Sequence, residues 1–337
     1  ADEPVGLDQR FVEVGLRVRC PSPVAAVVDP LRERHQVRGQ PRPVLDHQLA
    51  ILAERGIPVA QDLELNVLEW SQEGVAMLLL HGFGNEAHIW DDFAPVVAPY
   101  YRTIAMDLRG HGDSAHDPKR RYEYQSHVRD LEDVTAALGI DRLVLVGHSL
   151  GGRISTLFAA QHPERLAGLI LVDSGPELDP RGTSRISTDV ERGLALTFAS
   201  LAECENALAR AYPAARPAVL ARMARCGMRE REDGRYERKT DPAFHAFRGE
   251  LTAAEAEALE KRTARELWDA LARISCPALV VRGAASDVLA PDTAERMVEE
   301  VLPNAQLAVV AHAGHSVMTD NPEGFTEAVA SFVLGEG

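Results

Sequence analysis

Short apolar runs alternate with amphipathic stretches along most of the chain from Val75 onward. Runs that are apolar at every position are typical of strands buried on both faces, as in a parallel sheet covered by helices. Six runs of this kind, apolar at every position except Thr103 and Gln306, are residues 76–80, 103–106, 143–146, 169–172, 278–281 and 306–310. Residues 122–138 place their apolar side chains on one face of a helix. This alternation predicts an α/β fold with a mostly parallel sheet.

The first 61 residues follow a less regular pattern. Residues 10–19 and 62–70 have the pattern of strands, and residues 43–55 that of a helix with proline early and Gly56 just beyond its end. The stretch between the first strand and this helix is rich in proline. We interpret residues 1–61 as an N-terminal strand plus an extension or insertion. An alternative is that this segment forms an arm that packs on a lid or on a second subunit.

The spacing of strands breaks after residue 172, because the next apolar strand begins only at residue 278. Loops of that length without secondary structure are rare in compact domains. Helical patterns instead fill residues 190–211, 216–225, 252–259 and 262–271. We therefore expect a helical lid over residues 177–271, inserted after the sixth strand, and a core formed by residues 62–176 and 272–337.

Charge and cysteine content limit the partners. A net charge of −15 argues against nucleic acid or an anionic membrane surface as partner. No run of 18 apolar residues predicts a membrane span. We expect a cytoplasmic monomer or homodimer, and leave upstream processing open because the chain begins at Ala1. The four cysteines lack metal-site spacing, so we expect neither metal nor cofactor, and leave a Cys204–Cys226 disulfide open.

A serine lies between two glycines at a predicted strand-to-helix turn. Ser149 follows the run 143–146 and stands in Gly-His-Ser-Leu-Gly-Gly, residues 147–152. Glycine is needed two residues before and after the serine, because a side chain at either place would clash in the sharp turn. The pattern predicts a nucleophile elbow with Ser149 as nucleophile.

Serine needs a base and an acid to become a nucleophile. We favour His315 as the base over His312, because Gly314 frees its loop to turn the ring inward. The acid we favour is Asp287, after the strand 278–281, and the alternative is Asp173, at the end of the strand 169–172. All four positions fall at the carboxyl edge of the predicted sheet.

A tetrahedral intermediate also needs two backbone donors. The N–H of Leu150 follows the elbow, and the His-Gly-Phe-Gly segment at 81–84 offers the N–H of Phe83. Substrate-pocket candidates are Gly82, Trp90, Trp268 and Met318.

Five motifs together resemble the serine hydrolases of the α/β-hydrolase fold. They are HGFG (81–84), DLRGHGDS (107–114), GHSLGG (147–152), SDVLAP (286–291) and AGHS (313–316). The resemblance implies an eight-stranded type of sheet flanked by helices, and it places the nucleophile at Ser149, the acid at Asp287, the base at His315 and the oxyanion donors at Phe83 and Leu150. It extends from about residue 63 to the C-terminus, apart from the lid.

These residues predict an enzyme that hydrolyses a small carboxylic ester or lactone through an acyl-enzyme. The resemblance keeps one further reaction open, the hydrolysis of a carbon–carbon bond in a diketone-type substrate by the same triad. A cofactor-free oxygenase and a slow-turnover ligand receptor on this scaffold are lesser alternatives.

Overall fold

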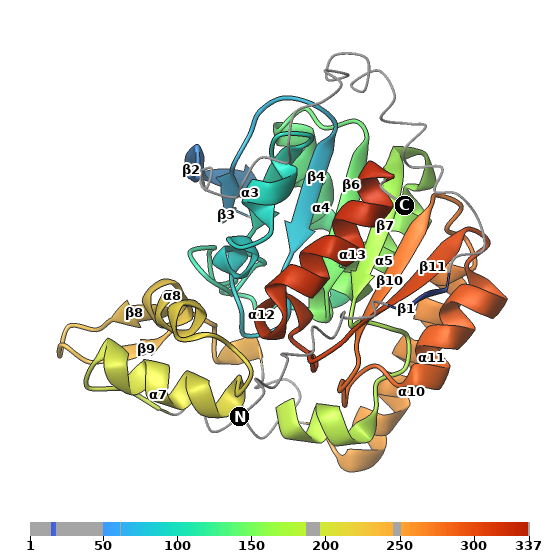
Figure 1. The fold of residues 1–337 in the computed structure, drawn as a ribbon. Helices are drawn as coiled ribbons and strands as arrows, with labels where there is room; N and C mark the ends of the chain where they lie inside the picture. Colours follow the sequence, from blue (N-terminus) through green and yellow to red (C-terminus); the bar gives the residue numbers. More distant parts are fainter. Residues whose placement is uncertain (1–14, 18–49, 61, 187–195, 245–250, 336–337) are drawn as a thin grey trace, which may run out of the picture.

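The computed structural model describes residues 15–17, 50–60, 62–186, 196–244 and 251–335. A twisted nine-stranded sheet runs through the molecule in the order β1-β11-β10-β7-β6-β4-β5-β3-β2 (Figure 1). Neighbours from β5 through β11 pair in parallel, while β2, β3 and β1 are antiparallel additions at the two edges. The strands are β1 (Gly15–Arg17), β2 (Ala53–Val59), β3 (Leu63–Glu69), β4 (Ala76–Leu80), β5 (Arg102–Met106), β6 (Leu143–His148), β7 (Leu166–Val172), β10 (Ala278–Gly283) and β11 (Ala305–Val310).

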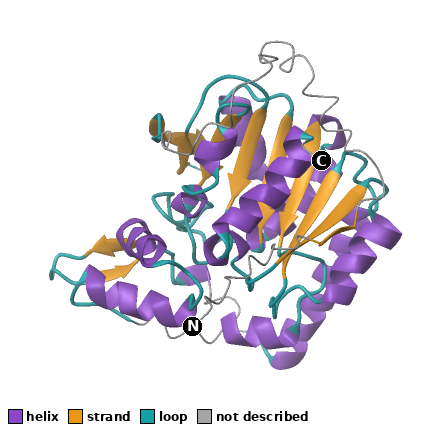
Figure 2. Ribbon diagram, viewed as in Figure 1, coloured by secondary structure: helices purple, strands orange, loops and turns teal. Residues whose placement is uncertain are grey.

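Apolar layers cover both faces of the sheet, which explains why its central strands are apolar at nearly every position. All residues of β4, β6 and β7 are buried. One face packs against α4 (Tyr124–Ala137), α5 (Leu150–Gln161) and α10 (Ala253–Leu271). The other packs against η1 (Ala87–Trp90), α3 (Ala94–Val97) and α13 (Pro322–Leu334), and Figure 2 shows helices on both sides of the strands. The α/β-hydrolase architecture expected from the sequence is confirmed, with β1 as a ninth strand.

The chain order of the strands creates a reversal point beside β4. The chain passes from β4 outward to β5, then returns to form β6 on the other side of β4 and continues through β7 and β10. Ligands of open α/β sheets bind at the carboxyl ends of the strands near such a point. The loops after β4, β6, β7, β10 and β11 all emerge at this edge.

The segment between β7 and β10 contains a small unit with its own apolar core. This unit, named here the α7–α8 unit, consists of α7 (Leu201–Ala211), α8 (Pro217–Gly227) and the hairpin β8 (Met228–Glu230) and β9 (Tyr236–Arg238). Cys204, Leu208 and Met223 are buried within it. Figure 1 shows it beside the sheet rather than on either face. It is tied to the core by Arg222, whose guanidinium lies 2.7 Å from the Asp92 carboxylate.

Several predicted elements differ from the structure. The patterns at 252–259 and 262–271 form one continuous helix, α10, which packs along α5. The predicted helix at 43–55 is wrong where it can be compared: residues 53–55 begin β2, because the full length of β2 pairs with β3. Residues 43–49 and 190–195 lie outside the described residues, as does all of the strand predicted at 10–19 except 15–17. The hairpin β8–β9 was not predicted, because each of its strands has only three residues.

Within the described ranges, no helix combines the length and apolar character that crossing a bilayer requires. Cys204, Cys226 and Cys276 are free thiols, so the open question of a Cys204–Cys226 disulfide is answered in the negative. Cys20 lies outside the described residues.

Candidate active site

The turn between β6 and α5 holds Ser149 in an uncommon backbone conformation. Its φ is 50° and its ψ −112°, a strained combination for a residue with a side chain. The turn is also crowded: a Cβ on Gly147 would lie 2.4 Å from the Gly151 carbonyl oxygen, and one on Gly151 would lie 2.5 Å from that of Leu80. The glycines of the motif are therefore required by contacts within the turn and with β4, as the predicted elbow demands.

The loop after β11 brings His315 to the serine. The His315 Nε2 lies 3.0 Å from the Ser149 Oγ, although the residues are 166 positions apart in the chain. The alternative base, His312, lines the same cavity as Ser149. Among the described residues, it forms no hydrogen bond with Ser149. The geometry thus agrees with the choice of His315.

Asp173 provides the carboxylate that contacts the imidazole. Its Oδ2 lies 2.7 Å from the His315 Nδ1, and its side chain is fully buried. The same oxygen accepts a hydrogen bond from the Ser286 hydroxyl at 2.6 Å, and Oδ1 accepts one from the Gly283 N–H at 3.2 Å. Asp173 has a φ of 45°, which aspartate tolerates better than most residues. These contacts fix the carboxylate at the end of β7.

Asp287, the acid preferred from the sequence, occupies a different place. Its two oxygens accept hydrogen bonds from the Arg185 guanidinium at 2.7 and 2.8 Å, and that contact lowers its pKa. The reason lies in the turn after β10, where the Ser286 N–H donates to the Gly283 carbonyl. Because of this turn, the Ser286 hydroxyl contacts Asp173, whereas Asp287 lies in the cavity wall. The alternative acid, Asp173, is the one beside His315.

Two further histidines at the site are held neutral. Burial lowers the pKa of His81 to about 4, its Nδ1 donates to the Gly82 carbonyl and its Nε2 accepts from the Leu108 N–H. Burial and the neighbouring His315 also hold the pKa of His148 well below its ordinary value. The His148 Nε2 donates to the backbone carbonyl of His315 at 2.9 Å. The His148 ring packs against the His315 ring, with 4.8 Å between the ring centroids.

The two expected backbone donors flank the serine. Leu150 is the first residue of α5, and the first N–H groups of a helix have no partner within that helix. Phe83 lies in the cavity wall, and Gly82, the residue before it, lies against His148 and Ser149. A Cβ on Gly82 would lie 2.6 Å from the His148 ring and 3.2 Å from the Ser149 Cβ.

A cavity of about 680 Å³ opens over Ser149 and His315. Loops of the sheet contribute residues such as Phe83 and Asn85 to its lining. The segment between β7 and β10, which includes the α7–α8 unit, contributes Arg185, Arg210, Tyr212, Arg238 and Thr240. Sequence reasoning did not select these residues, since only the fold of the insertion brings them to the serine.

The aromatic residues proposed for the pocket do not line it. Trp90 is fully buried against Phe325, and Met318 is buried in the same core. Trp268 lies on α10, where its indole N–H donates to Glu177 and the Arg296 guanidinium covers its ring at 4.1 Å. Gly82 lies beneath the cavity against His148 and Ser149 rather than in its wall. All four predictions of lining residues are therefore corrected.

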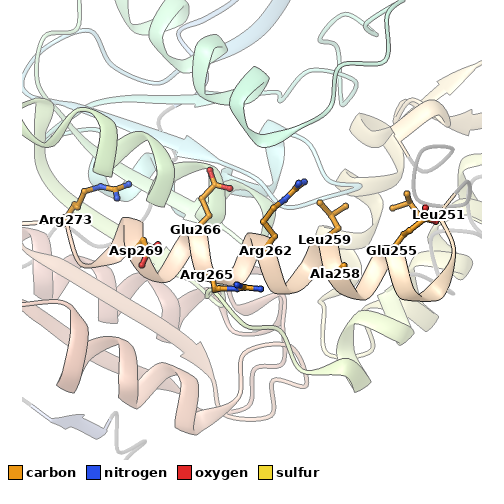
Figure 3. Close-up of a pocket in the computed structure, with 9 residues that line it drawn as sticks. All are labelled: Leu251, Glu255, Ala258, Leu259, Arg262, Arg265, Glu266, Asp269 and Arg273. Carbon is orange, nitrogen blue, oxygen red and sulfur yellow. The ribbon is translucent and has the colours of Figure 1, made fainter.

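A second hollow follows α10 and is separate from the serine (Figure 3). Its lining is mostly charged and extends from Leu251 to Arg273 on one helix and its flanks. It contains neither serine nor histidine, so it offers no equivalent of the Ser149 relay. Across the residues that the structure describes, no group of three or more histidine, cysteine or acidic side chains is arranged to hold a metal ion.

The comparisons with known proteins agree with this fold. The family model for the alpha/beta hydrolase fold matches residues 75–322. The chain is 27% identical over 275 residues to a 2-(acetamidomethylene)succinate hydrolase of Mesorhizobium japonicum, covering 80% of this chain and 92% of the relative. It is 28% identical over 287 residues to an sn-1-specific diacylglycerol lipase of Mus musculus, covering 80% and 85%.

A crystal structure of E-2-(acetamidomethylene)succinate hydrolase superimposes with a TM-score of 0.71 at 26% identity, covering 83% of this chain and 98% of the other. The family match covers most of the chain and includes the elbow, the base and both acids considered for the relay. The chain belongs to the alpha/beta hydrolase fold family, and its relatives are named as hydrolases.

Proposed function

We propose that this protein is a serine hydrolase that cleaves a carboxylic ester or lactone through an acyl-enzyme intermediate. The observation that carries the proposal is the continuous relay from Ser149 through His315 to Asp173, with contacts of 3.0 and 2.7 Å. These are hydrogen-bond distances for a nucleophile, its base and the acid that orients the base.

The relay would move one proton in each half of the reaction. The Ser149 oxygen attacks the carbonyl carbon while His315 Nε2 takes the hydroxyl proton, and His315 then gives that proton to the departing alkoxide. Water next enters, His315 takes one of its protons, and the hydroxide attacks the acyl group. The tetrahedral intermediate formed by this attack then collapses. The bond between the Ser149 oxygen and the acyl carbon breaks, and His315 returns the proton to Ser149. Asp173 remains ionised and stabilises the imidazolium in both halves.

The oxyanion would lie between the N–H groups of Leu150 and Phe83. The N-terminus of α5 adds a favourable partial positive charge at this place. Removing one donor of such a pair typically lowers kcat by about 10² to 10³.

Within the inserted segment, residues 177–271, the α7–α8 unit would serve as the lid, whereas α10 packs on the sheet. The presence of Tyr212 and Arg238 in the lining of the cavity that contains Ser149 supports this role. Among the relatives, the name of the diacylglycerol lipase supports ester cleavage, and that of the 2-(acetamidomethylene)succinate hydrolase supports a small acyl substrate.

The proposal is tested by covalent labelling with a fluorophosphonate, read as adduct mass, together with turnover of a panel of esters and lactones. We expect one adduct and turnover in the wild type, and neither in Ser149→Ala. The matched control is Ser331→Ala, which alters a serine of α13 outside the cavity lining and should leave both readouts unchanged. Labelling or turnover that survives in Ser149→Ala would refute the proposed nucleophile. Labelling without turnover of any ester or lactone would refute the proposed substrate class.

A further inference from the structure

The cavity that contains Ser149 is also lined by an arginine for which the described residues show no hydrogen bond or ion pair. Arg238 ends β9, is half-buried and lines the cavity. Its Nε is buried and makes no hydrogen bond. Leaving a buried donor without a partner costs free energy, which a ligand that accepts its hydrogen bond would recover.

Among the described residues, the acids that line the cavity form their hydrogen bonds with groups other than Arg238. Asp287 accepts two hydrogen bonds from Arg185. Asp320, the other acid of the lining, accepts the Gly314 N–H at 2.8 Å, and burial raises its pKa. Arg210, at the end of α7, adds a further positive charge in the wall. Among the residues that the structure describes, the lining therefore contains three arginines and two acids.

This local excess of arginine contrasts with the net charge of the whole chain, which is −15. A diffuse negative field repels an anionic molecule at a distance, so an anion would need a local site with strong donors. A guanidinium provides that site, because its planar fork matches a carboxylate in charge and geometry.

We propose that Arg238 binds a carboxylate of the substrate, so that the preferred substrates are esters with a second, ionised carboxyl group. This inference rests on the proposed function, since it names the substrate class for the Ser149 relay. The scissile carbonyl would lie at Ser149, and the free carboxylate would extend toward β9 and the end of α7.

The test compares monomethyl esters of dicarboxylic acids from succinate to suberate with the methyl esters of monocarboxylic acids of equal chain length. We expect kcat/KM of the wild type to favour one of the charged esters. In Arg238→Met, which keeps the length of the side chain and removes its charge, this preference should fall by about 10- to 100-fold while the neutral esters change less than about threefold.

The matched control is Arg229→Met in the same hairpin. Arg229 pairs with Glu237 at 2.8 Å and lies outside the cavity lining, so the substrate preference should remain. Equal preference in wild type and Arg238→Met would overturn the inference while leaving ester hydrolysis intact.

A binding assay separates this result from failure of the proposed function. We expect the free dicarboxylates to raise the melting temperature of the wild type and of Arg229→Met, but not of Arg238→Met. If the dicarboxylates raise the melting temperature only when Arg238 is present, but the protein hydrolyses none of the esters, the carboxylate site is supported and the proposed ester hydrolysis is refuted. Equal stabilisation of wild type and Arg238→Met, or none in either, would refute the site.

Discussion

Asp173 and Asp287 predict opposite results for the same conservative substitution. In Asp173→Asn, the Asn oxygen would replace Oδ1, which accepts the Gly283 N–H. The amide NH₂ would then face His315 Nδ1, 2.7 Å away, where the carboxylate now accepts. A donor at this place favours the tautomer with its proton on Nε2, which cannot take the proton of Ser149.

The cost of that tautomer can be estimated. Replacing the acid of a serine-protease triad by Asn lowers kcat by about 10⁴, which corresponds to about 5 kcal/mol of transition-state stabilisation. We expect a loss of this size in Asp173→Asn. In Asp287→Asn we expect a change of less than about threefold, because the lost contact with Arg185 is a partly exposed ion pair, and such pairs contribute about 0 to 1 kcal/mol.

The assay is kcat and kcat/KM of both variants on the best ester, with melting temperatures and fluorophosphonate labelling as checks of folding. Both variants should melt as cooperative proteins, and labelling should slow only in Asp173→Asn. A loss of 10³ or more in Asp287→Asn, with Asp173→Asn within tenfold of wild type, would refute the assignment of the acid.

Two further predictions concern stability. Gly151→Ala should lower the free energy of unfolding by about 1 to 3 kcal/mol, because the new Cβ would lie within 2.7 Å of two backbone oxygens on β4 and the loop after it; an unchanged melting temperature would contradict this. Glu86→Gln should stabilise the protein at alkaline pH, since burial and the nearby Asp107 charge raise the pKa of Glu86 to about 8 from 4.5. The folded state holds a proton that the unfolded chain releases above pH 4.5, so the contribution of Glu86 is complete below that pH and is lost as pH rises through 8. Thermal melts from pH 5 to 9 should show a gap between variant and wild type that widens toward pH 8, and a gap independent of pH would refute the argument.

Local steric requirements explain what the sequence could predict. The apolar runs became β4, β6, β7 and their neighbours because each strand is buried on both faces, so its pattern does not depend on one particular partner. The elbow was equally predictable, because the glycines around Ser149 are demanded by contacts within the turn itself. The helix predicted over residues 43–55 failed where β2 begins, because pairing with β3 is a tertiary contact that local propensity does not contain.

The acid was harder to place because two aspartates end at the same edge of the sheet. Asp173 and Asp287 follow the adjacent strands β7 and β10, and both positions are compatible with the order of nucleophile, acid and base in the chain. Which of the two contacts His315 depends on two side-chain contacts. The Ser286 hydroxyl donates a hydrogen bond to Asp173, and Arg185, 102 positions from Asp287 in the chain, pairs with Asp287. Neither contact has a signature in the spacing of motifs. The pocket aromatics failed for a related reason, since an aromatic residue in a motif-rich region more often joins the core, as Trp90 does.

The core and the inserted segment contribute different residues to the site. Ser149 and Asp173 come directly after the buried strands β6 and β7, and His315 lies on the loop after β11. Tyr212 and Arg238, which line the same cavity, belong to the segment of the α7–α8 unit, which has a separate apolar core and is joined to the rest of the protein by the Arg222–Asp92 ion pair. A substitution in the hairpin β8–β9 can therefore alter the charge of the cavity without displacing the strands that hold the nucleophile. If Arg238 binds the substrate as proposed, the reaction is determined by the sheet and the choice of substrate by the insertion.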